Sequence, residues 1–176
     1  MTAADSEAIL PIDPRKTGTQ LRPDLWDTIN QRYPGSMIRK DSYVPQAKLA
    51  KPLSQSRLTL ISSCGVHLKS DAPLDVCHPF GDFRFLRVPS AAKHEDLIIH
   101  QLKYPHDDAD LDVNVIFPSE RLQAIQAEGI VGTLSANLFS VIGYNMDPDK
   151  LERTVAAGIA DAVEEERADC ALLAPA

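Results

Sequence analysis

The stretch that decides the fold runs from Leu58-Thr59-Leu60-Ile61 into Cys64-Gly65-Val66-His67-Leu68-Lys69-Ser70-Asp71. Its first four residues are apolar or β-branched, which is typical of a buried strand. Small residues and a glycine end this run, and a histidine, a lysine and an aspartate follow it. In α/β folds the loops after parallel strands carry the polar groups of a site. The stretch therefore predicts a strand that leads into a site loop.

The rest of the chain after Arg57 alternates strand-like and helix-like patterns. A helix capped by Ser119 is predicted to end at Gly129, and another begins at Asp147-Pro148, with an apolar residue every four positions as far as Arg167. Strands are predicted at 58–62, 83–88, 96–100, 112–117, 138–142 and 168–173, the last of them buried. This order predicts an α/β fold, a mostly parallel sheet flanked by helices.

Residues 1–56 differ from the α/β domain predicted at 57–176 because prolines recur along them. Proline interrupts helices and central strands, so we expect an extended, proline-rich N-terminal arm that wraps a surface or a partner subunit. Residues 23–30 are its one candidate helix. Trp26, the single tryptophan of the chain, packs on the domain or forms an oligomer contact.

Composition narrows the classes of function. A net charge of −7 argues against a nucleic-acid partner, which would need a basic face. The apolar runs are far shorter than the roughly 20 residues of a membrane helix. The first residues lack the basic start and apolar core of a signal peptide, so we expect a cytoplasmic protein.

Cofactor and metal motifs are missing from the sequence. The chain has neither the GxGxxG spacing nor a GxxxxGK loop, so no nucleotide cofactor is expected. Cys64, Cys77 and Cys170 show no CxxC spacing, and no zinc site is expected among the cysteines and histidines. The cysteines are predicted to be free thiols.

Cys64 and His67 are the candidate catalytic residues. A thiol near His67 and Lys69 would have a lowered pKa, and the thiolate is the reactive form. The alternative is that Cys64 is a small buried residue at the end of a strand. His67 is the stronger candidate because loops at strand ends collect functional residues.

The candidate substrate-binding residues are Lys69, Asp82, Asp112 and Asn114. Asp82 follows a glycine in a predicted turn, where it pairs with Arg84 or Arg87 or contacts the substrate. Asp112 and Asn114 point the same way if their segment is a strand. They then bind a small polar ligand or lock a neighbouring loop.

An acidic run from His106 to Asp112 suggests a cation site. Three of its aspartates match positions one, three and five of a calcium loop, but Val113 and Ser119 stand where glycine and glutamate are needed. A solvated acidic loop is the alternative, and a local divalent or Arg/Lys-paired site stays open.

These pieces together resemble the B components of the glycine, sarcosine, betaine and D-proline reductases, many of them selenoproteins. The similar segments lie within residues 58–174: Gly65-Val66-His67-Leu68-Lys69, Gly81-Asp82, Arg87 with Pro89, Asp112-Val113-Asn114, Phe117-Pro118, Arg121-Leu122, Gly129–Gly132 and Ala168-Asp169-Cys170-Ala171-Leu172-Leu173.

The resemblance implies an oxidoreductase subunit of a larger assembly, acting on a small amino acid or amine-derived substrate. It also implies that a selenolate or thiolate, just after the final strand, attacks a substrate held as a Schiff base on a partner subunit. The chain reads Leu173-Ala174-Pro175-Ala176 there, so no residue takes the nucleophile's place. Three explanations stay open: a UGA codon read as a stop, a remainder that was removed or left out of the sequence, or a complete chain with another function. The alternatives are a non-redox lyase or hydrolase using Cys64 and His67, and a non-catalytic binding or structural subunit.

Overall fold

The computed structural model describes residues 27–28, 31–32, 34 and 47–176. The contacts divide the chain into Met1–Pro45 and Gln46–Ala176, and the account below concerns the second unit. Residues 27–28 and 31–32 are helical. Trp26 and most of the helix predicted at 23–30 lie outside the described residues.

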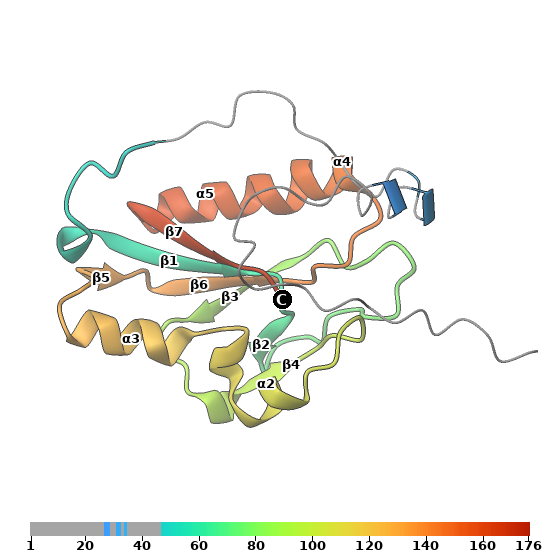
Figure 1. Cartoon of the computed structure of the whole chain (residues 1–176), viewed down its shortest axis with the longest axis horizontal. Helices are drawn as coiled ribbons and strands as arrows, with labels where there is room; N and C mark the ends of the chain where they lie inside the picture. The colour runs from blue at the N-terminus through green and yellow to red at the C-terminus, as the bar shows by residue number, and fades with distance from the viewer. Residues whose placement is uncertain (1–26, 29–30, 33, 35–46) are drawn as a thin grey trace, which may run out of the picture. The chain divides into compact units, whose positions relative to one another are not determined.

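The second unit alternates strands with helices (Figure 1). Its strands are β1 (Arg57–Ser62), β2 (Val66–Leu68), β3 (Phe85–Pro89), β4 (Leu97–Ile99), β5 (Thr133–Leu134), β6 (Asn137–Val141) and β7 (Cys170–Ala174). Its α-helices are α2 (Asp107–Leu111), α3 (Ser119–Ala127), α4 (Pro148–Lys150) and α5 (Ala157–Glu165). A π-helical turn (Leu151–Ala156) joins α4 to α5, and 3₁₀ turns lie at Leu53–Gln55, His94–Asp96 and Val113–Val115.

The central sheet has five strands and is mostly parallel, as predicted. β1 is parallel to β5, β6 and β7, and β3 is antiparallel to β6. β7 lies on the other side of β1 from β5 and β6. β2 and β4 form a separate antiparallel pair, in which His67 is opposite Ile98.

Helices cover both faces of this sheet, α5 on one and α3 on the other (Figure 1). Alternate residues of β1 and β6 serve the two cores, as the period of two in a strand requires. Leu60 and Leu138 pack with Leu122 of α3. Phe139 packs with Val155 and Ile159 of the other helix. The fold class predicted from the sequence is therefore confirmed.

The start of the last helix follows its prediction. Asp147 caps it by accepting a hydrogen bond from the Lys150 amide at 2.9 Å, and Pro148 occupies the first turn. The apolar repeat of four residues is longer than the α-helical period of about 3.6. The wider π-helical turn keeps Leu151 and Val155 facing the same core as Ile159.

The strand predicted at 112–117 is wrong. Residues Val113–Val115 form a 3₁₀ turn because the Asp112 carboxylate accepts a hydrogen bond from the Asn114 amide at 3.0 Å. Val113 and Phe117 are buried, whereas Val115 between them is 63% exposed. The buried apolar residues in this segment are therefore four positions apart, whereas a strand would have buried every second residue.

Two smaller predictions also need correction. Ser119 does not cap α3: it lies inside the helix, and its buried hydroxyl has no hydrogen-bond partner among the described residues. The final strand is an edge strand rather than a buried one. Leu172 and Leu173 of β7 are 40% and 68% exposed. Within the described residues, no helix is both long and apolar enough to span a bilayer.

Candidate functional site

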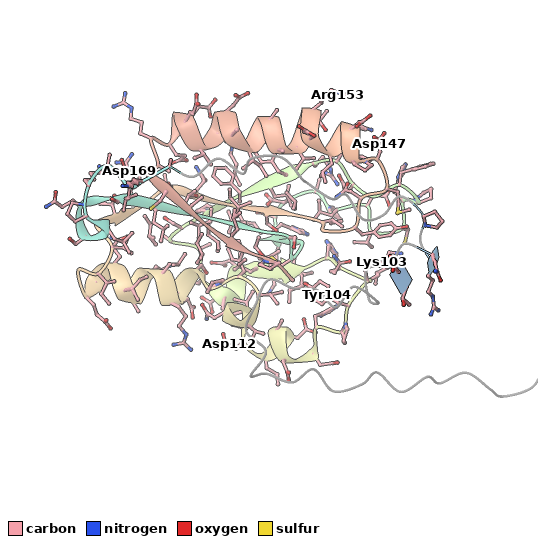
Figure 2. All side chains as sticks on the ribbon, turned by 45° about the horizontal axis from the view of Figure 1, so that its top comes forward. Lys103, Tyr104, Asp112, Asp147, Arg153 and Asp169 are labelled. Atoms are coloured by element: carbon pink, nitrogen blue, oxygen red, sulfur yellow. The ribbon has the colours of Figure 1, made fainter. Side chains whose placement is uncertain are left out.

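The parallel strands β1, β6 and β7 end together at one side of the sheet. We call this side the carboxyl edge and define it as Ser62–Gly65, Val141–Gly143 and Ala174. Ser63 donates its backbone N–H to Ala174 at 3.3 Å, and its carbonyl accepts from Gly143 at 3.1 Å. Ligands of open α/β sheets bind beyond this edge. Lys103, Tyr104 and Asp147 lie at this end of the sheet, and Asp169 at the opposite end (Figure 2).

Gly65 turns the chain sharply at the carboxyl edge. Its φ is +71°, in the left-handed region that glycine tolerates. Its amide donates to the Val141 carbonyl at 2.8 Å, and its own carbonyl accepts from the His100 amide at 3.0 Å. The turn therefore places the segment after β4 beside the end of β1.

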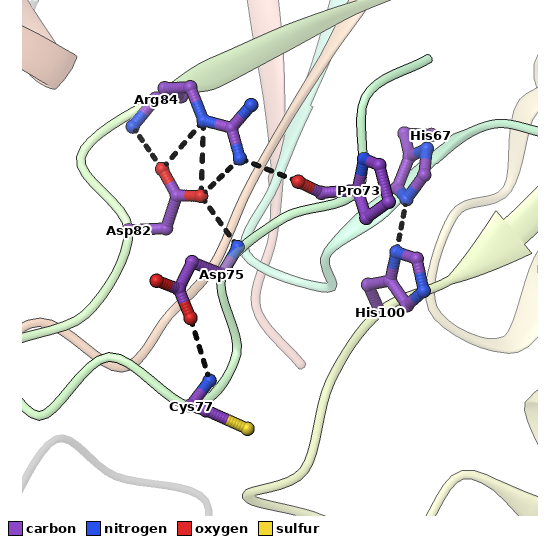
Figure 3. Close-up of polar contacts among 7 residues, drawn as sticks. All are labelled: His67, Pro73, Asp75, Cys77, Asp82, Arg84 and His100. Atoms are coloured by element: carbon purple, nitrogen blue, oxygen red, sulfur yellow. Dashed lines mark hydrogen bonds and ion pairs between the residues drawn. The ribbon is translucent and has the colours of Figure 1, made fainter. Parts of the chain in front are cut away.

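The rings of His67 and His100 meet in a hydrogen bond (Figure 3). His67 is 1% exposed, and its Nε2 lies 2.6 Å from Nδ1 of the half-buried His100. Nδ1 of His67 donates to the Leu68 carbonyl at 2.7 Å. Burial, and then the neighbouring His67, lower the pKa of His100. Both ring nitrogens of His67 are thus occupied, so His100 is the more accessible imidazole.

Tyr104 also contacts the carboxyl edge, at Cys64. Its hydroxyl donates to the Cys64 carbonyl at 2.9 Å. Burial, with help from Cys64 and Asp110, raises the pKa of Tyr104 to about 12. The phenol therefore keeps its proton in the neutral range, where it acts as a hydrogen-bond donor.

The Cys64 side chain points into the core rather than out of the edge. It is 0% exposed, and its Sγ lies 3.7 Å from Oγ of Ser140. Burial raises the pKa of the Cys64 thiol, although hydrogen bonds such as that from Ser62 lower it in part. A thiolate is therefore disfavoured at this position, and this weighs against Cys64 as a nucleophile.

Hydrogen bonds of Asp82 hold together the loop between β2 and β3. Its side chain is 6% exposed and takes a two-pronged hydrogen bond from Arg84, which also donates to the Pro73 carbonyl at 2.7 Å (Figure 3). The Asp75 amide donates to the same carboxylate at 2.8 Å. Burial raises the pKa of Asp82, but the hydrogen bonds from Arg84 and Asp75 outweigh it and hold the pKa below its usual range. The predicted pairing with Arg84 is confirmed.

Lys69 is exposed and has no hydrogen bond to either histidine among the described residues. Its Nζ donates to the Glu95 carbonyl at 2.7 Å. It lines a shallow hollow of about 440 Å³ with Leu68, Ser70, Pro89, Ala91, Ala92 and Asp96. This hollow lies at the end of β3, which runs opposite to β6, and so not at the carboxyl edge.

Asp112 and Asn114 do contact each other, but at the start of α3. Asn114 Nδ2 donates to Asp112 at 2.8 Å, and Asn114 Oδ1 accepts from the Glu120 amide at 3.1 Å. The hydrogen bonds from Asn114 lower the pKa of Asp112. The pair therefore fixes the turn before α3, which is the locking role considered for it.

The acidic run folds into α2 rather than a loop. His106 Nδ1 lies 2.9 Å from a carboxylate oxygen of Asp110, one helical turn away. In the described part of the chain, no three His, Cys, Asp or Glu side chains converge as metal ligands.

The predicted site residues therefore fall into separate groups. Among the described residues, no hydrogen bond or ion pair joins His67, Asp82 and the Asp112–Asn114 pair. The sequence reasoning did not single out His100 and Tyr104. His100 ends the strand predicted at 96–100, and the argument that selected His67 applies to it equally. Tyr104 carries no local signal, because its contact with Cys64 spans forty residues.

Comparison with known proteins supplies one relative. The chain is 26% identical over 142 residues to the D-proline reductase subunit gamma of Acetoanaerobium sticklandii. The alignment covers 77% of this chain and 57% of the relative. The chain thus spans little more than half the length of the protein it matches. No family model and no solved structure matches the chain. The chain is distantly related to a reductase subunit.

Proposed function

We propose that the chain is a component of a dithiol-dependent reductase that acts on a small amino acid or amine-derived substrate. The observation that carries this proposal is the similarity to D-proline reductase subunit gamma, which extends over 77% of the chain. The relative's substrate is a small cyclic amino acid. The proposal extends that class of substrate to this chain.

The carboxyl edge supports the proposal as the place of reaction. The resemblance places the family's redox residue just after the final strand. Ala174 ends β7, and its carbonyl accepts the Ser63 amide at 3.3 Å. A residue that follows this strand is therefore close to the turn that holds His100 and Tyr104.

We do not assign the redox-active group to Cys64, because its thiol is buried and its pKa is raised. In this proposal a thiol or selenol outside the described residues, or on a partner subunit, carries the electrons. The selenoprotein character of the assembly is part of the proposal. His67 has a supporting role, and substrate contacts by Lys69, Asp82, Asp112 and Asn114 stay predictions.

The experiment uses the protein purified from its native cells. Its intact mass and the transcript after the Ala176 codon establish the mature chain. Dithiol-driven reduction is then measured with glycine, sarcosine, betaine and D-proline. We expect turnover of at least one of them that depends on the dithiol. An assembly with no dithiol-dependent turnover of any of the four would contradict the proposal.

A partner subunit and a cytoplasmic location are further proposals. The first is supported by the relative's name, which describes a subunit. Light scattering of the native protein, with and without residues 1–50, tests it. We expect a mass above that of one chain, which falls when the arm is removed. An unchanged single-chain mass in both cases would exclude an assembly held by the arm.

A further inference from the structure

The hydrogen bonds of His67 and His100 determine which nitrogen of each ring carries the proton. The Leu68 carbonyl can only accept, so the hydrogen bond at 2.7 Å requires a proton on Nδ1 of His67. A neutral His67 then has a lone pair on Nε2. The hydrogen bond at 2.6 Å between the rings therefore requires His100 to donate from Nδ1. In a neutral His100 the remaining nitrogen, Nε2, is an acceptor.

Nε2 of His100 is available to a ligand. Its Nε2 makes no hydrogen bond to any of residues 47–176, and the residue is half-buried rather than enclosed. Its backbone amide is fixed on Gly65 at the carboxyl edge. The ring is thus held from one side by His67 and offers a lone pair of known orientation on the other.

We propose that Nε2 of His100 is the atom through which this chain exchanges a proton with its substrate, and that His67 is its positioning residue. This inference rests on the proposed function. It moves the acid–base role from His67, whose nitrogens are both occupied, to the neighbouring ring.

The step balances with the dithiol of the proposed reaction. The dithiol becomes a disulfide, and the substrate gains two electrons and two protons. His100 carries one of these protons. The Nε2–H bond of its imidazolium breaks as the C–N bond of the substrate breaks and an N–H bond forms on the departing nitrogen. The electron pair and the other proton form a C–H bond on the carbon. A thiol of the dithiol then protonates Nε2 again as it becomes a thiolate.

The electrostatic setting suits a proton donor. Burial and the neighbouring His67 lower the pKa of His100, so its imidazolium releases a proton readily. Among the described residues, His67 is the titratable side chain that lowers the pKa of His100. Tyr104 donates its hydroxyl proton to the Cys64 carbonyl rather than to the ring of His100.

The first test is the tautomer, which does not depend on activity. Nitrogen-15 NMR of the full chain with labelled histidine should find both His67 and His100 protonated at Nδ1 near neutral pH. His78, which is exposed, is the reference. A proton on Nε2 of neutral His100 would overturn the proposal, whatever the enzyme does.

The second test uses a matched pair at position 67. His67→Phe keeps the volume and removes the acceptor, whereas His67→Gln keeps an acceptor oxygen. We expect the Phe variant to shift the alkaline limb of the pH profile of kcat, where the His100 imidazolium loses its proton, and the Gln variant to restore it in part. A purely structural role would lower stability in both without moving the pH profile.

The third test is turnover of the native assembly carrying His100→Gln. Loss of an acid–base group lowers kcat by about 100-fold to 10,000-fold. His78→Gln should turn over like the unaltered protein. If the unaltered assembly turns over and His100→Gln keeps its kcat and pH profile, the proposal is wrong. If the unaltered assembly shows no dithiol-dependent turnover, the proposed function fails, and the NMR result then decides the state of His100 alone.

Discussion

Gly65 and His100 approach so closely that a Cβ atom on Gly65 would lie 2.3 Å from the carbonyl oxygen of His100. The contact is between two backbones, so no side-chain rotation relieves it. This approach places the segment after β4 beside the end of β1. It therefore decides where His100 and Tyr104 stand.

Gly65→Ala should destabilise the protein strongly. The left-handed φ of +71° and the contact with His100 act together, and we expect a loss of about 3 kcal/mol or more in unfolding free energy. Urea denaturation measures it. Gly129→Ala is the control, because Gly129 also has a positive φ of +74° but no atom within 4 Å of its added Cβ. That variant should lose only about 1–2 kcal/mol. Equal losses would contradict the close approach.

Asp82→Asn should remove part of the dependence of stability on acid. The folded-state pKa of Asp82 is lowered, mainly because the hydrogen bonds from Arg84 outweigh burial. Its stabilisation is therefore present above the unfolded pKa of about 3.9, and it is lost as pH falls through the lower folded pKa. The variant should be less stable by about 1–3 kcal/mol at neutral pH, and its stability should fall less steeply below pH about 4.

Chemical denaturation across the acidic range measures this difference. Glu165→Gln is the control, because the ion pair of Glu165 with Arg87 has side chains that are 65% and 41% exposed. Breaking such an exposed pair costs less than about 1 kcal/mol. If the unfolding free energy of Asp82→Asn and of the unaltered protein fell equally steeply with acid, the hydrogen bonds between Asp82 and Arg84 would not form in solution.

The mostly parallel sheet and the helices on its two faces could be predicted from the sequence. Strand 58–62 is a continuous run of mostly apolar residues and the stripe that includes Val155 and Ile159 is periodic, and the burial of both follows directly from these patterns. The last helix begins as predicted, with Asp147 as its cap and Pro148 in its first turn. In these segments the local preference and the tertiary packing agree.

The errors arose where tertiary position overrides local pattern. Residues 168–173 have the apolar run of a buried strand, but β7 lies at the sheet edge, and composition alone does not give strand order. Asp112 and Asn114 bond the backbone nearby, which turned an alternating segment into a 3₁₀ turn. The histidine pair could not be predicted, because β2 and β4 meet only after the chain has folded.

Tyr104→Phe should relieve a loss of stability at alkaline pH. The pKa of Tyr104 is raised to about 12 by burial, then by Cys64 and Asp110, against about 10 in an unfolded chain. Its stabilisation is complete below the unfolded value and is lost as pH rises through the folded value. Denaturation between these two values measures the difference. Tyr144→Phe, which keeps Tyr104, should retain the alkaline loss, and the same loss in Tyr104→Phe would contradict the assignment.

Asn114→Ala should affect folding rather than substrate binding. Asn114 accepts from the Glu120 amide and bonds Asp112, so its loss leaves the start of α3 without a cap. We expect a loss of about 1 kcal/mol in unfolding free energy. The KM of the native assembly should not change. A raised KM with unchanged stability would restore Asn114 as a substrate-binding residue.

Cys64 should be the least reactive of the three cysteines in the folded protein. Cys77 is exposed, Cys170 is half-buried and Cys64 is 0% exposed. Burial raises the pKa of both Cys64 and Cys170, and Asp169 adds to the effect at Cys170. Mass spectrometry after treatment with a thiol-reactive reagent should therefore find Cys77 labelled first, and Cys64 labelled only in denaturant. Fast labelling of Cys64 under native conditions would mean that its thiol reaches the carboxyl edge, and the hypothesis that Cys64 is the nucleophile would then be preferred to an external thiol or selenol.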